Sequence, residues 1–222
     1  MPPTPHILST PRSARYYTLG PDGGRADEVW VVLHGYGQAA ARFLRRFEPL
    51  ATPRRRIVAP EALSRFYLDD AHTRVGASWM TREDRDAEIA DYVAYLDGVL
   101  AAAGEPAADG ARLVVLGFSQ GAATAGRWLA LSPRLARRAP RADRLIARGA
   151  DLPHDLDLAA ARPWLSAVDL TLVVGDADPY ATPERVAAIE GRLREAEVPY
   201  RRLRYPGGHR IEPDVLTSLA DG

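Results

Sequence analysis

Short apolar runs alternate with longer amphipathic segments along the chain, and this alternation restricts the folds that the chain can adopt. The clearest runs are Glu28–Leu33, Arg112–Phe118 and Leu170–Val174, each followed by a turn or by a segment with helical spacing. Runs that are apolar at consecutive positions are typical of strands buried on both faces, as in a parallel sheet covered by helices. The alternation therefore predicts an α/β fold with a mostly parallel central sheet flanked by helices.

Weaker patterns complete the expected sheet. Two shorter apolar runs predict further strands. A segment that alternates arginine with apolar residues predicts an edge strand with one solvated face, and a segment near the N-terminus is expected to add an antiparallel edge strand. The shorter runs are Arg56–Ala59 and Leu145–Ala147, and the expected edge strands are Ser13–Leu19 and Tyr200–Tyr205.

Four segments between the strands have helical features. Thr81–Ala103 carries apolar residues at helical spacing; Thr81 with Asp84 predicts a capping box at its start, and Gly104 predicts its end. Thr182–Glu197 begins with an N-cap threonine followed by proline. The other two expected helices are Gln120–Leu131 and Glu212–Leu219.

Composition limits both the architecture and the chemistry. The chain has 222 residues, 46% of them hydrophobic, which fits a single domain spanning residues 1–222 with a sizeable core. The 29 acidic residues balance the 29 basic ones, so no net field attracts nucleic acid or an anionic membrane. The chain has no cysteine and no lysine, which excludes thiol nucleophiles and Schiff-base chemistry.

The sequence contains no signal for a membrane or an export pathway. The N-terminal segment has no apolar run long enough for a signal peptide, and no stretch approaches the roughly 20 apolar residues of a membrane span. The cytoplasm is therefore the expected location. The sequence leaves the oligomeric state open, a homodimer included.

The motif GFSQG at residues 117–121 is the strongest chemical signal in the chain. It lies where a predicted strand meets a predicted helix, the setting of a GxSxG nucleophile elbow. The turn raises the serine hydroxyl above the sheet, and side chains at the two glycines would collide with the strand or the helix. Ser119 is therefore predicted to be a nucleophile.

A nucleophilic serine needs a base and an acid, which follow it in the chain on this kind of fold. Only His154 and His209 lie after Ser119. His209 follows the last predicted strand in a glycine-rich turn, so it is the expected base. His154 precedes the strand that should carry the acid, and we interpret it as a surface residue.

The acid should follow the strand Leu170–Val174, where GDADP at residues 175–179 offers two carboxylates. Asp178 precedes a proline that restricts its backbone, whereas Asp176 could cap the turn. Spacing favours Asp178 but leaves both aspartates open.

Backbone N–H groups are expected to form an oxyanion hole. One donor belongs to Gln120, the residue after the nucleophile, and the other is expected from Tyr36 in the HGYG turn after the first strong strand. His34 precedes the serine and ends that strand, so its expected role is to hold this turn by hydrogen bonds.

Taken together, four motifs resemble those of the phospholipase/carboxylesterase family of α/β-hydrolases, which includes acyl-protein thioesterase-like enzymes. They are VLHGYG at residues 32–37, GFSQG at 117–121, GDADP at 175–179 and GH at 208–209. The resemblance extends from about Val29 to Leu216 and includes GASW at 76–79. It implies a hydrolase without a cap domain, metal or cofactor, with Ser119, Asp178 and His209 as its triad.

The chain departs from this family at two places that bear on the substrate pockets. Gln38 stands where better-known members have aspartate, and the segment after Asp178 lacks the hydrophobic pair that is common there. Aromatic and sulfur-containing side chains in the long segment Glu61–Met80 suggest a pocket wall, although packing under a long loop explains them equally well. The expected wall residues are Phe66, Tyr67, Trp79 and Met80.

The remaining polar clusters are expected to carry no chemistry. The arginines at 54–56 and at 201, 202 and 204 are interpreted as solvated faces rather than an anion site, because the total charge is balanced. Asp151, His154 and Asp155 are a weak metal signal. Trp128 is expected in the core.

Two classes of function follow from these observations. The first is a serine hydrolase that cleaves small-molecule carboxylic esters of short-to-medium acyl chains through an acyl-enzyme, with thioesterase or lysophospholipase-like activity as the alternative on the same triad. The second is a non-catalytic ligand-binding protein of the same fold. All three triad positions are filled, which favours the enzyme.

Overall fold

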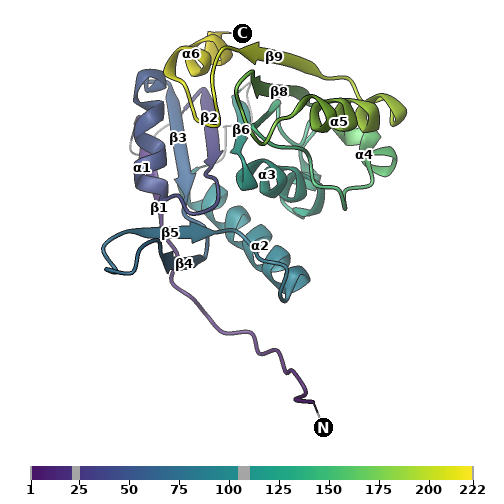
Figure 1. The fold of residues 1–222 in the computed structure, drawn as a ribbon. Coiled ribbons are helices and arrows are strands. Elements are labelled where there is room, and N and C mark those ends of the chain that lie inside the picture. Colours follow the sequence, from purple (N-terminus) through teal and green to yellow (C-terminus); the bar gives the residue numbers. More distant parts are fainter. Residues whose placement is uncertain (1, 22–25, 105–110, 222) are drawn as a thin grey trace.

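A seven-stranded sheet in the order β1-β3-β2-β6-β7-β8-β9 forms the centre of the molecule (Figure 1). The computed structural model describes residues 2–21, 26–104 and 111–221. Adjacent strands are parallel except for β1, which pairs antiparallel with β3 at one edge. The strands are β1 Tyr16–Leu19, β2 Glu28–Leu33, β3 Arg55–Pro60, β6 Arg112–Phe118, β7 Arg144–Arg148, β8 Asp169–Gly175 and β9 Arg201–Tyr205. The predicted mostly parallel sheet is confirmed, with strands at both expected edges.

Helices cover both faces of this sheet (Figure 1). Side chains of α2, α3, α4 and α5 contribute to the hydrophobic core on one face, and those of α1, η1 and α6 contribute to the core on the other. A further short helix, η2, follows α3. The helices are α1 Ala40–Leu44, η1 Arg45–Leu50, α2 Arg85–Ala103, α3 Gln120–Leu131, η2 Leu135–Arg137, α4 Leu158–Leu165, α5 Pro183–Glu195 and α6 Pro213–Asp221.

The apolar strands serve both cores because successive side chains point to opposite faces. In β2, Val29, Val31 and Leu33 pack with the first core, whereas Trp30 and Val32 pack with the second. The two cores therefore share the strands that were expected to be buried on both sides. Trp128 of α3 is fully buried in the first core, as predicted.

Two helix ends illustrate what the sequence could and could not indicate. In α5, Thr182 is the N-cap and its hydroxyl accepts a hydrogen bond from the N–H of Arg185, as expected. The capping box predicted for α2 is wrong. The helix begins after Asp84, which has a left-handed backbone and makes no side-chain cap, while Thr81 bonds to Glu88 instead.

Residues 61–80 differ from the expected loop, which is a second correction. This segment contains an antiparallel hairpin of β4 Ser64–Tyr67 and β5 Val75–Ser78, separate from the main sheet. An isolated bridge between Gln38 and Ala77 joins the hairpin to the turn after β2. In β4, Ser64 and Phe66 are partly buried, whereas Arg65 and Tyr67 are exposed. Among the helices of the described part of the chain, none is long and apolar enough to cross a bilayer.

Candidate active site

The serine of the GFSQG motif lies in a tight turn between β6 and α3. Ser119 has φ 54° and ψ −122°, a backbone conformation that non-glycine residues rarely adopt. A Cβ at Gly117 would overlap the backbone of Gly121 and Ala122, and a Cβ at Gly121 would overlap the carbonyl oxygen of Leu33. Both glycines are therefore needed for α3 to pack against the strands while the turn projects Ser119.

The residues after β8 and β9 bring a carboxylate and an imidazole together. The Nδ1–H of His209 donates a 2.8 Å hydrogen bond to Oδ2 of Asp178. The other carboxylate oxygen of Asp178 accepts a 2.9 Å hydrogen bond from the N–H of Tyr180. Asp178 is buried and His209 is half-buried, and the Tyr180 ring packs on the imidazole with centroids 4.6 Å apart. Both partners of the pair are thus held in place by their surroundings.

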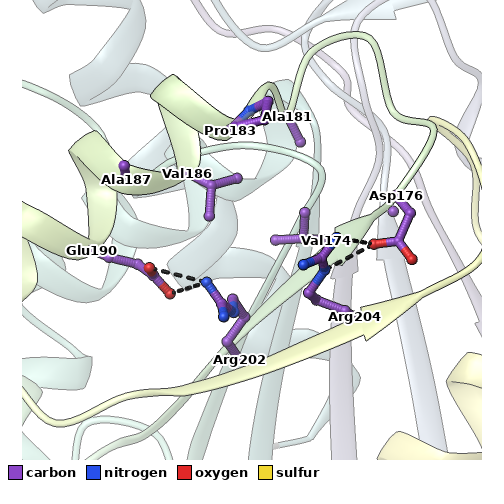
Figure 2. A pocket seen from close by; sticks show the side chains of 10 residues that line it. Val174, Asp176, Ala181, Pro183, Val186, Ala187, Glu190, Arg202 and Arg204 are labelled. Atoms are coloured by element: carbon purple, nitrogen blue, oxygen red, sulfur yellow. Dashed lines mark hydrogen bonds and ion pairs between the residues drawn. The ribbon is translucent and has the colours of Figure 1, made fainter.

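Asp176, the other carboxylate that spacing left open, has a different partner. It forms an ion pair with Arg204 of β9, with 2.7 Å between Nη2 and Oδ1. Figure 2 shows its carboxylate directed at Arg204, in a hollow beside β9 where Arg202 also pairs with Glu190. Of the two aspartates, Asp178 is the one that contacts His209.

Ser119 and the His209–Asp178 pair both lie against the end of β7 and the glycine that follows it. The N–H of Ser119 donates to the carbonyl of Arg148 at 2.9 Å. The next residue, Gly149, is so close to the pair that a Cβ there would lie 3.0 Å from Nδ1 of His209 and 3.1 Å from Oδ2 of Asp178. The ring of Phe118, which precedes the serine, lies 4.7 Å from the imidazole. The three predicted triad residues therefore surround one short stretch of backbone.

The HGYG turn packs directly against the serine. A Cβ at Gly35 would lie 3.1 Å from Cβ of Ser119, and the N–H of Gly35 is bonded to the side chain of Gln38. His34 is fully buried: its Nδ1–H donates to the Gly35 carbonyl, and its Nε2 accepts from the N–H of Ala62. Burial lowers the pKa of His34, which keeps the ring neutral in this arrangement. His34 holds the turn that contains Tyr36, as expected.

Gln120 links the serine turn to the segment before α2. Its side-chain oxygen accepts a 3.0 Å hydrogen bond from the N–H of Trp79, and its Nε2 donates to the Met80 carbonyl at 2.8 Å. The indole N–H of Trp79 donates in turn to the His34 carbonyl at 2.8 Å. These bonds connect the serine turn, the hairpin and the HGYG turn into one network.

A cavity of about 470 Å³ opens beside Ser119, between the loop after β7 and helix α5. Its lining is mostly small and aliphatic, with Asp151, His154 and Arg185 among its few charged or polar residues. Burial raises the pKa of Asp151. The other lining residues are Ser119, Gln120, Ala123, Ala147, Gly149, Ala150, Leu152, Pro153, Leu172, Val173, Val174, Tyr180, Ala181, Val186, Ala188 and Ile189.

The four residues expected to form a pocket wall lie elsewhere. Trp79 is 2% exposed and belongs to the core, and Met80 packs partly buried against that core. Phe66 stacks on the Tyr36 ring with centroids 5.2 Å apart, and Tyr67 is 58% exposed on the hairpin. None of the four lines the cavity beside Ser119. Core packing, the alternative reading, describes Trp79 and Met80.

The arginine clusters only partly match the solvated faces expected from the sequence, because Arg56 is buried and donates hydrogen bonds to the backbone carbonyls of Pro21 and Ala103. Arg54, Arg55 and Arg201 form ion pairs with carboxylates, in the same way as the two arginines of Figure 2. The His154 side chain is largely exposed on its loop and lies 3.7 Å from Asp151. Within the described residues, no group of histidine and acidic side chains has the arrangement of a metal site.

Sequence reasoning missed two features of the site. Arg148 is the last residue of β7 and Gly149 follows it; both lie against the His209–Asp178 pair, but the predicted strand stopped at Ala147. The signal that could have revealed them is a charged residue followed by glycine at the end of a buried run. The α5 side of the cavity includes Val186 and Ile189. No sequence pattern marks them as cavity residues, because apolar residues at helical spacing are typical of ordinary core packing.

Comparison with known protein families identifies the family of the chain. A family model described as "Serine hydrolase (FSH1)" matches residues 29–214. The chain belongs to this family. The match covers both the GFSQG turn and His209 of this serine hydrolase, and it agrees with the α/β-hydrolase resemblance expected from the motifs.

Solved structures show where the fold of this serine hydrolase recurs. Acyl-protein thioesterase 2 of Zea mays has a TM-score of 0.67 at 20% identity, covering 94% of this chain and 97% of its own. Esterase PE8 has a TM-score of 0.65 at 21% identity, covering 94% and 96%. A phospholipase/carboxylesterase from Dyadobacter fermentans has a TM-score of 0.61 at 23% identity, covering 94% and 95%. No curated protein sequence matches the chain. At these identities the likeness establishes the α/β-hydrolase fold.

Proposed function

We propose that this serine hydrolase cleaves carboxylic esters of short-to-medium acyl chains through a triad of Ser119, His209 and Asp178. The observation that carries the proposal is the 2.8 Å hydrogen bond between His209 and the buried Asp178, beside a serine in a strained turn. A serine hydroxyl is a weak nucleophile unless a base removes its proton, and an imidazole oriented by a carboxylate is such a base.

The reaction proceeds in two halves. His209 Nε2 takes the proton of Ser119 as the hydroxyl oxygen attacks the ester carbonyl, and the protonated ring then gives that proton to the departing alcohol. Water, deprotonated by the same imidazole, hydrolyses the acyl-enzyme. Asp178 holds Nδ1–H throughout, which keeps Nε2 free to accept a proton.

The backbone N–H groups of Gln120 and Tyr36 are proposed to bind the oxyanion. The N-terminus of α3 begins at Gln120, where unpaired N–H groups and the helix dipole favour negative charge. The turn that contains Tyr36 is supported by the contact of Gly35 with Ser119 and by the bonds of His34. Such donors are effective because they are already oriented before charge develops.

The cavity beside Ser119 is the proposed acyl site. Its volume of about 470 Å³ and its small aliphatic lining suit an acyl chain better than a charged or bulky group. The segment between β7 and β8 contains one eight-residue helix, α4, which supports the proposal that no cap domain covers this cavity. Open access favours small soluble esters.

The test is hydrolysis of p-nitrophenyl esters with two to twelve acyl carbons by the wild type and three variants. We expect Ser119→Ala and Asp178→Asn to lower kcat by about 1,000-fold or more. Asp176→Asn is the matched control, because this aspartate follows the same strand but pairs with Arg204, and it should keep kcat near that of the wild type.

Each result has a clear meaning. Turnover that depends on Ser119 and peaks at short or medium chains supports the proposal. Preference for a matched thioester, or a peak at the longest chains, replaces it with a thioesterase or lysophospholipase-like activity. A folded protein that cleaves no ester and no thioester would be a ligand-binding member of the family.

A further inference from the structure

Arg148 is a buried arginine at the end of β7, next to the proposed triad. Its side chain is 3% exposed, and its Nη1 lies 3.5 Å from Oδ2 of Asp178, the same oxygen that accepts from His209. Burial lowers the pKa of Arg148, while the charge of Asp178 raises it. Arginine nevertheless stays charged in proteins, so the buried cation and the buried carboxylate compensate each other.

The same guanidinium binds the loop that carries His209. Its Nη2 donates to the carbonyl of Gly208 at 2.9 Å and to the carbonyl of Arg210 at 2.5 Å. These two residues flank His209 on either side. The ring of Tyr205 stacks on the guanidinium at 4.5 Å, and its hydroxyl also donates to the Gly208 carbonyl. The backbone on both sides of the imidazole is thus tied to Arg148.

The backbone of Arg148 reaches the third member of the triad. Its carbonyl accepts the hydrogen bond from the N–H of Ser119. This bond fixes the strained turn relative to β7, whereas the side chain fixes the Asp178 and His209 loops. A single residue is therefore connected to the nucleophile turn, the acid and the base.

We propose that Arg148 is a positioning residue that holds the loops of Asp178 and His209 in register with Ser119. This inference rests on the proposed triad. The guanidinium suits the task because its planar fork donates to several fixed acceptors at once, which a lysine ammonium on a flexible stem does less well. Arg148 touches no reacting atom, and its effect passes through Asp178 and His209.

Arg144 provides a matched control on the same strand. It is also buried, and it also donates to a C-terminal carbonyl, that of Leu219, and pairs with a carboxylate, Asp169, at 3.3 Å. Its position at the other end of β7 places these contacts away from Ser119. A purely structural role of buried arginines would make the two positions equivalent in activity assays.

The experiment compares Arg148→Met with Arg144→Met. Both variants should lose stability in urea unfolding, because each removes a buried guanidinium that bonds to backbone carbonyls of the C-terminal segment. Arg148→Met also leaves the buried Asp178 without its cation. We expect Arg148→Met alone to lower kcat by about 100-fold, the effect of a catalytic group displaced by about 1 Å, with KM nearly unchanged. Equal kcat values for the two folded variants would overturn the proposal.

A conservative pair keeps the test decisive if a methionine variant does not fold. Arg148→Lys retains the charge but loses the forked donors, so kcat should fall by about tenfold, whereas Arg144→Lys should leave it unchanged. Full activity of Arg148→Lys together with full activity of Arg144→Lys would show that the orientation of the fork is irrelevant and would also overturn the proposal.

Labelling by a fluorophosphonate separates this inference from the proposed ester hydrolysis. In that reaction Ser119 Oγ attacks phosphorus and expels fluoride, and His209 takes the serine proton, so no ester substrate is needed. If the wild type is labelled at Ser119 but cleaves no ester, the proposed ester hydrolysis is wrong. The positioning role of Arg148 is then tested by comparing the labelling rates of the variants. A labelling rate of Arg148→Met equal to that of Arg144→Met would overturn the role.

Discussion

Adding one methyl group at Gly149 should impair the reaction more than the fold. Gly149 has φ +65°, and a Cβ there would lie 3.0 Å from both Cε1 and Nδ1 of His209 and 3.1 Å from Oδ2 of Asp178. The methyl group of Gly149→Ala would therefore press on the hydrogen bond between the imidazole and the carboxylate. Contacts of this length require the neighbouring atoms to move by a few tenths of an ångström.

The geometry at Gly149 determines how much thermal stability and how much kcat the methyl group should cost. A left-handed backbone costs a residue with a Cβ about 1–2 kcal/mol. For a protein of this length, each kcal/mol corresponds to about 2–4 °C in Tm. We therefore expect Tm to fall by roughly 2–8 °C. A displacement of about 1 Å costs about 100-fold in rate, so a shift of a few tenths should lower kcat by about tenfold.

The control is Gly104→Ala, which also places a Cβ on a residue with positive φ but does not touch the His209–Asp178 pair. Gly104 ends α2 with φ +87°, and a Cβ there would meet only the side chain of Arg56, whose Nη1 would lie 2.7 Å away. Thermal unfolding and p-nitrophenyl ester kinetics are measured on both variants. Comparable loss of Tm with unchanged kcat in both would refute the reasoning, since Gly149 would then matter only through its backbone.

Three further changes test other parts of the structure. Thr182→Ala removes the 3.4 Å cap of α5 and should lower the free energy of unfolding by about 0.5–1 kcal/mol in urea titrations; no change would mean that the cap is not formed. Burial lowers the pKa of His34 in the folded protein. As the pH falls below 6.5, the ordinary pKa of histidine, His34 therefore takes up a proton in the unfolded chain but not in the folded one. Stability should then decrease with falling pH by at most about 1.4 kcal/mol per pH unit, and the loss between pH 7.5 and 5 should be smaller in His34→Gln. Ala123→Trp should shift the preferred acyl chain to shorter lengths, and an unchanged chain-length profile would place the substrate outside the cavity.

The sequence indicated the sheet and the order of the proposed site residues because both depend on local patterns. Buried parallel strands are apolar at every position, and the GxSxG turn leaves no room for side chains at Gly117 and Gly121. The predicted strand ends then placed one aspartate pair and one histidine at the edge of the sheet where Ser119 lies. Which of the two aspartates contacts His209 depended on loop geometry, which spacing does not encode.

The walls of the cavity were not predictable in the same way. Aromatic residues in 61–80 suggested a wall, but that segment forms a hairpin whose Trp79 is buried in the core. The cavity is lined instead by aliphatic residues such as Val186 and Ile189, which a sequence pattern cannot distinguish from ordinary core. The role of Arg148 was hidden for a related reason, because its partners are backbone carbonyls far along the chain.

The first turns of α5 line the cavity, whereas the proposed reacting groups lie at the ends of β6, β8 and β9. Part of the cavity wall therefore lies on a helix that carries none of the proposed triad residues. Exchanging residues such as Val186 or Ala188 reshapes the space offered to an acyl group while leaving the hydrogen bonds at the strand ends intact. Because the proposed triad residues lie outside α5, this helix is the segment to randomise in a directed-evolution library aimed at the substrate range.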